Sequence, residues 1–387
     1  MKENNLDHNP PTVSEMPTGG RREVGRAELH SSLRSEWAPD LYLSFLPEKL
    51  RKEVIFTIEQ GLRELKKIKW PIQAVVWGGG FKDGEVVYTE NKLGSDIDLY
   101  IFSNFAPLFW KKIKKFEKKI NKKNSISFHF HGVIPLFLPK SRTYWAYRLK
   151  NQGVVLKGDK EILNKIQANS NNIPKIEAIR ILFWNLALWL NSPSNPQRIL
   201  RSYLNLGESY LTFAGKLASS FKERVIQFDE VSQQFNLDDE LQKKIKLGYK
   251  TRMGPLETGL GKDLTLERAK QDCLGAIDHL LSIYLKTNVS LEEKLDILRK
   301  EIRPRYLFNL ALFYFLKDLK EIKPRFFPIV FRFKITDLWK MVVYSKVGEK
   351  EKLFEILKKY FKVQKFSEET LIKIFEAHPT LSTVELV

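Results

Sequence analysis

The spacing of apolar residues changes once along the sequence, at about Pro174. Several segments between residues 72 and 159 are short and apolar or alternate between apolar and polar residues, which is typical of β-strands. After Pro174 the apolar residues recur every three or four positions, which is the helical period. We therefore expect an α/β (α+β) domain with a mixed sheet at residues 36–165, followed by an all-α domain at residues 170–387.

The first domain alternates predicted helices with predicted strands. Strands are predicted at residues 72–77, 96–102, 125–137 and 154–159. Helices are predicted at residues 47–69, 107–123 and 141–152, the last with Gly153 as its C-cap. On the second of these helices, four apolar residues form one stripe that we expect to cover the sheet: Phe109, Ile113, Phe116 and Ile120.

The second domain contains six segments with clear helical periodicity. They are residues 176–191, 197–217, 267–286, 291–302, 305–319 and 349–363. Breaking sequences such as "NSPSNP" and "MGPLETGLGKD" separate them. No repeat of fixed period is visible in this domain.

The first 35 residues differ from the rest in composition. They hold several prolines and glycines and almost no aliphatic periodicity, so they cannot bury enough apolar surface to offset the entropy lost on ordering. They also lack the apolar segment of a secretory signal. We therefore predict a disordered tail at residues 1–35.

Composition indicates a folded protein of the cytoplasm. Hydrophobic residues make up 43% of the chain and aromatic residues 12%. The longest apolar runs, residues 181–190 and 306–316, are about half of the ~20 residues that a membrane-spanning helix needs, so we predict buried helices and no membrane partner. The single cysteine, Cys273, excludes an intramolecular disulfide and a cysteine-based zinc site.

The chain carries a formal net charge of +19, and eight lysines lie on the predicted helix at 107–123 with one glutamate. An excess of this size favours a polyanionic partner such as RNA. A solvated helix face that keeps the protein soluble explains it equally well. Both interpretations stay open on the sequence.

Residues 77–102, "WGGGFKDGEVVYTENKLGSDIDLYIF", combine a glycine-rich turn with a pair of aspartates. Asp96 and Asp98 are two residues apart on a predicted strand, so their carboxylates project to the same face. Such a pair suits Mg²⁺ beside nucleotide phosphates, because this ion keeps several waters and needs few protein oxygens. Glycines after a strand let backbone N–H groups approach an anion closely.

Over about residues 50–165 the chain resembles the DNA polymerase beta-type nucleotidyltransferase superfamily, in which a Gly-Ser turn precedes an [ST]-D-[IVL]-D-[LIV] strand. Gly79 and Gly80 lie at the Gly-Ser positions and Gly84 at the final glycine of the turn. Residues 95–99, "SDIDL", match the aspartate strand. The "GVVLKGD" segment at 153–159 is similar to the G-x-x-L-x-G-D segment of many small members.

The resemblance implies transfer of a nucleoside monophosphate from a nucleoside triphosphate to a hydroxyl or phosphate of an unidentified acceptor. It makes Asp96 and Asp98 the catalytic ligands of Mg²⁺ or Mn²⁺. The implied nucleotide-binding residues are Gly79, Gly80, Lys82, Gly84 and Ser95.

Three positions depart from the superfamily pattern. Gly80 replaces the hydroxyl residue, and Asp83 stands where the arginine would be, with Lys82 beside it. The third strand offers no carboxylate to face the aspartate pair. On that face the alternation places Ser127, His129 and His131.

His129 and His131 are therefore candidates for the catalytic base, since histidine titrates near neutral pH. Asp83 or Glu85 is a candidate for a further metal ligand. The departures also leave a second interpretation open, a non-catalytic module that binds a nucleotide or a protein partner. A regulatory component of antitoxin or defence type belongs to this class.

Overall fold

The structure, a computed structural model, describes residues 42–88, 92–124, 126–190, 196–252, 264–301 and 334–360. All of them belong to one compact unit of the chain. The tail predicted at residues 1–35 and the helical segment predicted at 305–319 lie outside the described residues.

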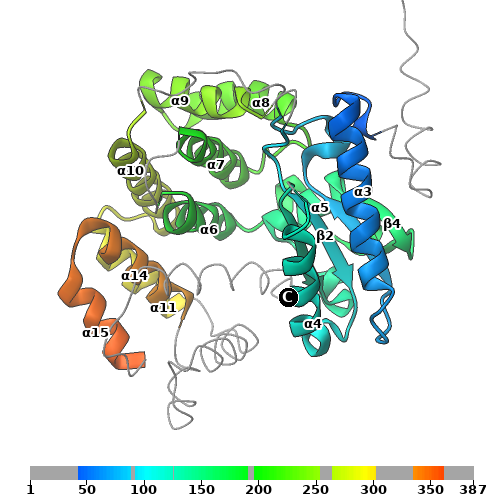
Figure 1. Cartoon of the computed structure of the whole chain (residues 1–387). Coiled ribbons are helices and arrows are strands. Elements are labelled where there is room, and N and C mark those ends of the chain that lie inside the picture. Colours follow the sequence, from blue (N-terminus) through cyan, green and yellow to red (C-terminus); the bar gives the residue numbers. More distant parts are fainter. Residues whose placement is uncertain are drawn as a thin grey trace, which may run out of the picture. The chain divides into compact units, whose positions relative to one another are not determined.

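A four-stranded mixed sheet forms the centre of the first part of the chain (Figure 1). Its strands are β1 (Ala74–Gly78), β2 (Ile97–Phe102), β3 (Phe128–Val133) and β4 (Val154–Gly158), in the order β3-β2-β1-β4. Strand β1 is antiparallel to β2 and β4, whereas β2 and β3 are parallel and need the crossover that helix α4 supplies. The mixed sheet predicted from the sequence is confirmed.

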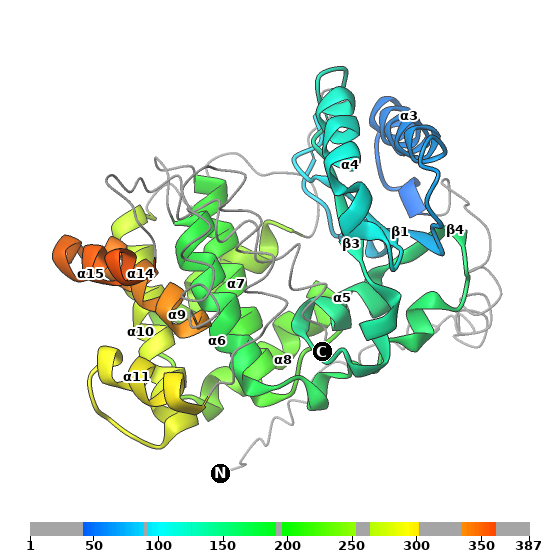
Figure 2. The ribbon, with the colours of Figure 1, turned by 90° about the horizontal axis from the view of Figure 1, so that it is seen from below.

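Helices α3 (Glu48–Leu65) and α4 (Ala106–Asn121) lie side by side over one face of the sheet (Figures 1 and 2). Every second strand residue points into this layer, where Trp77, Leu99 and Phe130 are buried. Three of the four apolar residues predicted for the α4 stripe are fully part of this core: Phe109, Ile113 and Ile120. The fourth, Phe116, is only half-buried at its edge.

Strand β3 is shorter than the predicted strand at 125–137. It ends at Val133, because Pro135 has no N–H to continue a ladder. Residues Pro135–Lys140 form a 3₁₀-helix instead. Helix α5 (Tyr144–Gln152) then begins at Thr143, whose hydroxyl accepts a hydrogen bond from the backbone N–H of Ala146 at 3.1 Å.

The regular elements described after Pro174 are all helical, as predicted. They are α6 (Lys175–Trp184) with a π-helical extension (Asn185–Trp189), α7 (Pro196–Ala214), α8 (Phe221–Gln234), α9 (Asp239–Lys250), α10 (Leu266–Leu285), α11 (Leu291–Glu301), α14 (Ile335–Val347) and α15 (Lys350–Tyr360). Helices α8, α9 and α14 are absent from the sequence prediction. Two of them carry N-cap signals that could have shown them, Ser220 with Glu223 before α8 and Asp238 before α9.

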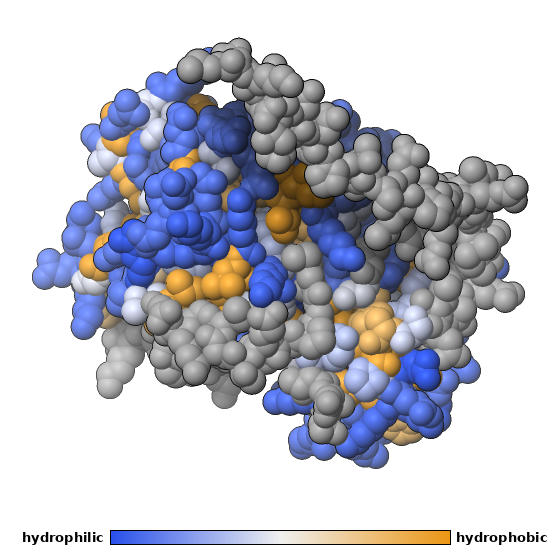
Figure 3. All heavy atoms as spheres, turned by 90° about the horizontal axis from the view of Figure 1, so that it is seen from above, coloured by the Kyte–Doolittle hydropathy of each residue, from blue (hydrophilic) through white to orange (hydrophobic). Residues whose placement is uncertain are grey.

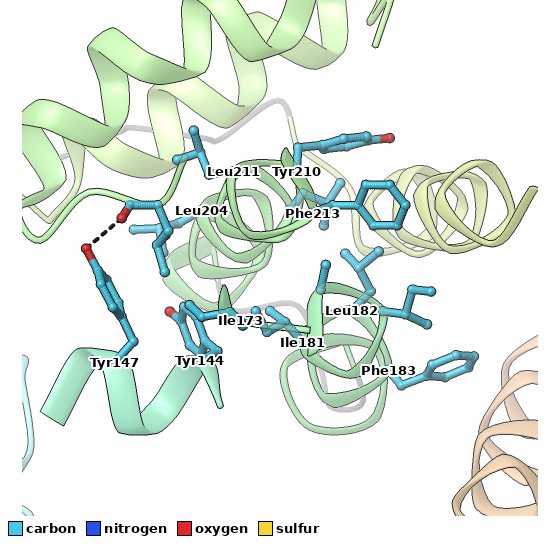
Figure 4. Packing of buried hydrophobic residues seen from close by; sticks show 14 of the residues in the cluster. Tyr144, Tyr147, Ile173, Ile181, Leu182, Phe183, Leu204, Tyr210, Leu211 and Phe213 are labelled. Carbon is cyan, nitrogen blue, oxygen red and sulfur yellow. Dashed lines mark hydrogen bonds between the residues drawn. The ribbon is translucent and has the colours of Figure 1, made fainter. Parts of the chain in front are cut away.

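The second face of the sheet shares one hydrophobic core with these helices. Val76, Phe102 and Val133 from the sheet belong to the same buried cluster as residues of α5, α6, α7 and α10. Figure 4 shows part of this packing, in which Tyr144 and Tyr147 of α5 approach side chains of α6 and α7. The hydroxyl of Tyr147 donates to the carbonyl oxygen of Leu217 at 2.6 Å.

Hydrophilic residues cover much of the face drawn in Figure 3, and hydrophobic residues appear there in separate patches. Among the helices that the structure describes, none combines the length and the apolar character that crossing a bilayer requires.

Candidate functional site

The glycine-rich turn lies directly beside the second aspartate in the sheet. In the antiparallel pair of β1 and β2, Gly78 is the register partner of Asp98. The next residue, Gly79, has φ of 90°, a conformation that residues with a Cβ rarely adopt. The turn then forms a 3₁₀-helix at Gly80–Asp83 that ends at Gly84. The predicted proximity of the turn to the aspartate strand is therefore present.

The backbone at Gly80 leaves no room for the hydroxyl residue of the superfamily pattern. A Cβ at this position would lie 2.4 Å from the carbonyl oxygen of Glu85, and real Cβ contacts are longer than this. The departure at Gly80 thus matches a local backbone approach that only glycine permits without a shift.

The polar face of β2 and β3 brings three of the predicted site residues together, Asp98, His129 and His131. Asp98 is the register partner of His129, and Tyr100 is the partner of His131. The Nε2 atom of His131 donates to Oδ1 of Asp98 at 3.0 Å. The imidazole of His131 also stacks on the ring of Tyr100, with ring centroids 4.8 Å apart.

The two aspartates have opposite pKa shifts. Desolvation by the surrounding protein, followed by repulsion from Asp98, raises the pKa of Asp96, although its side chain is still exposed to solvent. Desolvation also opposes ionisation of Asp98, but the hydrogen bond from His131 and the nearby positive charges outweigh it and lower the pKa of Asp98. Asp98 is therefore the member that loses its proton more readily, and the ionised form of Asp96 is the one that gains most from a cation.

His129 is held by a carboxylate that sequence reasoning did not assign to the site. Its Nδ1 lies 3.7 Å from Oε1 of Glu117, the single acid of the lysine-rich helix α4. Its Nε2 lies 3.1 Å from the Ser127 hydroxyl. Glu117 also accepts the backbone N–H of Phe130, at the edge of the sheet, and the ammonium of Lys114.

This pairing shifts the pKa values of both partners. Burial alone would raise the pKa of Glu117, but its interactions with His129 and Lys114 bring that pKa down to about 2. The carboxylate of Glu117 in turn raises the pKa of His129, against the effect of desolvation. The carboxylate nearest to the histidines of β3 therefore comes from α4, where it contacts His129.

Two residues predicted to bind the nucleotide have other contacts. Ser95 is buried, and its hydroxyl accepts the backbone N–H of Val87 at 3.0 Å. Lys82 donates to the backbone carbonyl of Asn151 at 2.8 Å. Both side chains therefore bind to the protein backbone, so their contacts give no support to a role in nucleotide binding.

Glu85, which the sequence left as a candidate for a further metal ligand, has other partners in the fold. It is 3% exposed and accepts hydrogen bonds from the side chain of Gln152 and from the backbone N–H of Phe221, at the start of α8. A carboxylate at a helix N-terminus is stabilised by the helix dipole, so Glu85 has a structural position here. The other proposed ligand, Asp83, ends the 3₁₀ turn.

Arginines of α5 and α7 contribute to the electrostatic surroundings of the aspartates. The charge of Arg148, on α5, helps to lower the pKa of Asp98, and that of Arg201, on α7, opposes the rise in the pKa of Asp96. No sequence signal connects these arginines with the aspartates, because they come from distant segments. Within the described ranges, no group of three or more His, Cys, Asp or Glu side chains is arranged to hold a metal ion.

Comparison of the chain with protein-family models, with curated proteins and with solved structures gives no match.

Proposed function

We propose that the Asp96–Asp98 face binds a nucleoside triphosphate with Mg²⁺ or Mn²⁺ and transfers its nucleoside monophosphate to a hydroxyl or phosphate acceptor. The observation that carries the proposal is the strand register, which sets the Gly79 turn beside Asp98. A glycine-rich turn and a pair of carboxylates are two parts from which a site for a metal-bound triphosphate can be built.

The carboxylates at this face suit the metal in their chemistry. Mg²⁺ prefers oxygen ligands and is usually held by one or two carboxylates together with substrate phosphates, so a third protein carboxylate is not required. Asp96 is exposed, and repulsion from Asp98 contributes to its raised pKa, a cost that a cation would relieve. In such a site the metal supplies neutralisation of negative charge on the phosphate oxygens.

His129 is the residue placed to accept the acceptor's proton. In the proposed reaction the acceptor oxygen forms a bond to the α-phosphorus, the bond to the bridging oxygen breaks, and pyrophosphate leaves. The proton of an attacking hydroxyl passes to His129, whose other ring nitrogen faces Glu117. His131 orients Asp98 through its hydrogen bond and its stacking on Tyr100.

A triphosphate-binding assay tests the proposal. We expect wild-type protein to bind at least one of the four nucleoside triphosphates in the presence of Mg²⁺, measured by calorimetry. Exchange of both Asp96 and Asp98 for Asn should abolish this binding while circular dichroism shows the fold retained. Asp239→Asn, the same exchange at an exposed position of α9, should bind as the wild type does.

A second function, non-catalytic nucleotide or partner binding in a regulatory module, is favoured by one contact. The hydrogen bond from His131 occupies Oδ1 of Asp98, which an active site would otherwise offer to the metal. Incubation with α-labelled triphosphates, Mg²⁺ or Mn²⁺, total cellular RNA, protein and small metabolites separates the two functions. Transfer of label supports the enzyme, whereas binding without transfer supports the module.

A further inference from the structure

Two arginines near the aspartate face each have a buried guanidinium Nε without a hydrogen-bond partner. The Nε atoms of Arg201 and Arg252 are inaccessible to solvent and have no hydrogen-bond partner. In the described part of the chain, no ion pair joins either side chain to an acid. Leaving a buried charged donor unpaired is costly, so such groups usually have a ligand or a functional reason.

Helix packing brings the two arginines to the same end of one helix pair. A Cβ on Gly248 of α9 would lie 2.6 Å from the backbone nitrogen of Leu204 on α7, so the two backbones touch there. Three residues earlier on α9, the side chain of Ile245 packs against Gly207, which lies three residues later than Leu204 on α7. Moving back along α7 therefore corresponds to moving forward along α9.

Arg201 lies three residues before Leu204, and Arg252 lies four residues after Gly248. Helix α9 ends at Lys250, and Arg252 follows in the turn after it, so the packing of the two helices places both arginines at the same end of the helix pair. The indole of Trp189 lies under the Arg201 guanidinium, 5.3 Å from its centre, and fixes that side chain from one side. The like charges that result are not neutralised by the nearest buried acid.

That acid, Glu208, already has other partners. It accepts hydrogen bonds from Arg224 and from the hydroxyl of Tyr144, and it is 1% exposed. Burial, together with the charges of neighbouring arginines, accordingly lowers the pKa of Arg201 and of Arg252. Asp96 is close enough to oppose both of these shifts, which connects the arginine pair with the proposed catalytic face.

We infer that Arg201 and Arg252 form a binding site for a phosphoryl group opposite Asp96. A phosphoryl group carries more than one negative charge and offers several acceptor oxygens, which matches two guanidinium groups better than a single carboxylate does. Binding of a phosphoryl group at these arginines does not depend on the proposed function. The identity of the molecule that carries the group does, and under the proposed function it is either the donor triphosphate or a separate phosphate-bearing acceptor.

Calorimetric titration with inorganic pyrophosphate, without divalent metal and at low salt, tests the site directly. We expect the wild type to bind, and the double variant Arg201→Gln/Arg252→Gln to bind roughly tenfold more weakly or not at all. Arg198→Gln is the matched control, because this arginine is exposed on the same helix, and it should bind as the wild type does. No binding by the wild type, or equal binding by the double variant, would overturn the inference.

Thermal unfolding separates a ligand site from a structural role. In phosphate-free buffer the double variant should unfold at the same temperature as the wild type or higher, because two buried Nε donors without a hydrogen-bond partner are removed. Pyrophosphate should raise the unfolding temperature of the wild type only. A double variant that is destabilised without ligand, together with a wild type that pyrophosphate does not stabilise, also contradicts the inference.

Competition identifies the source of the phosphoryl group. Saturation with Mg²⁺ and a triphosphate that carries an α,β-methylene bridge should block pyrophosphate binding if the site holds the donor, and should leave it intact if the site holds an acceptor. The Asp96→Asn/Asp98→Asn variant keeps the two proposals apart. It should lose triphosphate binding with Mg²⁺ and still bind pyrophosphate alone through the arginines.

Discussion

The contact between Glu117 and His129 gives the site a pH dependence that can be worked out. Glu117 has a folded pKa of about 2 against an ordinary 4.5, so its stabilising contribution is present above pH 4.5 and is lost as the pH falls toward 2. His129 has a pKa raised from 6.5, so its contribution is present below pH 6.5 and is lost as the pH rises through the raised value.

Glu117→Gln is therefore expected to lower the free energy of unfolding most between pH 4.5 and 6.5, by about 1–3 kcal/mol, and hardly at pH 2. Urea unfolding across this range measures the effect. Glu267→Gln is the control, because Glu267 also pairs with a lysine three residues away but contacts no histidine, and it should change stability by less than about 0.5 kcal/mol.

The same substitution should move the pH dependence of the proposed transfer reaction. His129 accepts a proton only when it is neutral, so the rate is expected to increase as the pH rises through the raised pKa of His129. Removing the Glu117 charge should shift this increase to lower pH, together with the imidazole signals of His129 in an NMR titration. An NMR titration of His129 that is the same in both proteins would show that Glu117 does not act on this ring.

A hydroxyl residue at Gly80 is expected to harm the protein rather than repair the superfamily pattern. The Cβ of Gly80→Ser would meet the Glu85 carbonyl at 2.4 Å, so the turn must shift, at a cost of about 1–3 kcal/mol in denaturant unfolding. Gly275→Ser, in an open position on α10, is the control and should be near neutral. A stable Gly80→Ser protein with tighter triphosphate binding would contradict this prediction.

At the scale of single residues, the sequence predicted which side chains share a face of the sheet, because strand periodicity controls this. Asp98, His129 and His131 share one face because side chains alternate along β2 and β3. The contacts of Ser95 and Glu85 could not be predicted, because their partners are backbone groups brought close by folding. The same holds for Glu117, which meets its histidine by reaching across from α4 to the edge of the sheet.

Among the elements, α4 is the one whose role the sequence predicts best. Ile113 is fully buried against the sheet, so Ile113→Ala should lower the free energy of unfolding by about 2–5 kcal/mol. Phe116 is half-buried, and Phe116→Ala should cost less than a fully buried phenylalanine would. Leu108 is 66% exposed, and Leu108→Ala should be near neutral. Equal losses for Ile113→Ala and Leu108→Ala would show that the stripe is not core.

Elements held by long-range contacts were harder to predict. Helix α8 has few buried apolar residues, so its periodicity is weak, and part of its N-terminal hydrogen bonding comes from Glu85 in another segment. The end of β3 was overestimated because the alternating pattern continues past Pro135. In both cases the periodicity of apolar residues alone does not show where the element begins or ends.

At the scale of the whole molecule, the charge of +19 is not spread evenly, and α4 carries a dense part of it. Several of its lysines have local contacts: Lys114 pairs with Glu117, Lys119 with Glu64, and Lys112 donates to the backbone of Lys67. Other lysines of this helix and its C-terminal turn are exposed to solvent: Lys115, Lys118, Lys122 and Lys123. These four lysines can bind a polyanion without first breaking one of the ion pairs or hydrogen bonds named above.

The start of α4 adds aromatic surface to this charge. Trp70 and Phe105 are 45% and 40% exposed and stack on each other, with ring centroids 5.5 Å apart. A surface cavity of about 440 Å³ is lined by Trp70, by the apolar side chains of Ile68, Leu108 and Phe109, and by four lysines, Lys69, Lys111, Lys112 and Lys115. Exposed aromatic rings among lysines are what a protein uses to bind single-stranded nucleic acid, because every base can stack and every phosphate is negative.

We therefore expect single-stranded RNA to bind along α4, with an affinity that falls steeply as salt increases. Exchange of Lys115, Lys118, Lys122 and Lys123 for Gln should weaken binding and reduce the salt dependence, because phosphate contacts are lost. Trp70→Ala should weaken binding by about 1–3 kcal/mol and leave the salt dependence unchanged, because stacking carries no charge. Fluorescence anisotropy with a labelled oligonucleotide measures both quantities.

The control for that experiment removes the same charge elsewhere, by exchange of the exposed Lys222, Lys243, Lys246 and Lys300 for Gln. Net charge alone attracts a polyanion from any direction, so a solubility role for the excess charge predicts equal losses in the two quadruple variants. A binding surface on α4 predicts that the control variant keeps most of its affinity. Equal losses, or a Trp70→Ala protein that binds as the wild type does, would leave solubility as the explanation of the lysines.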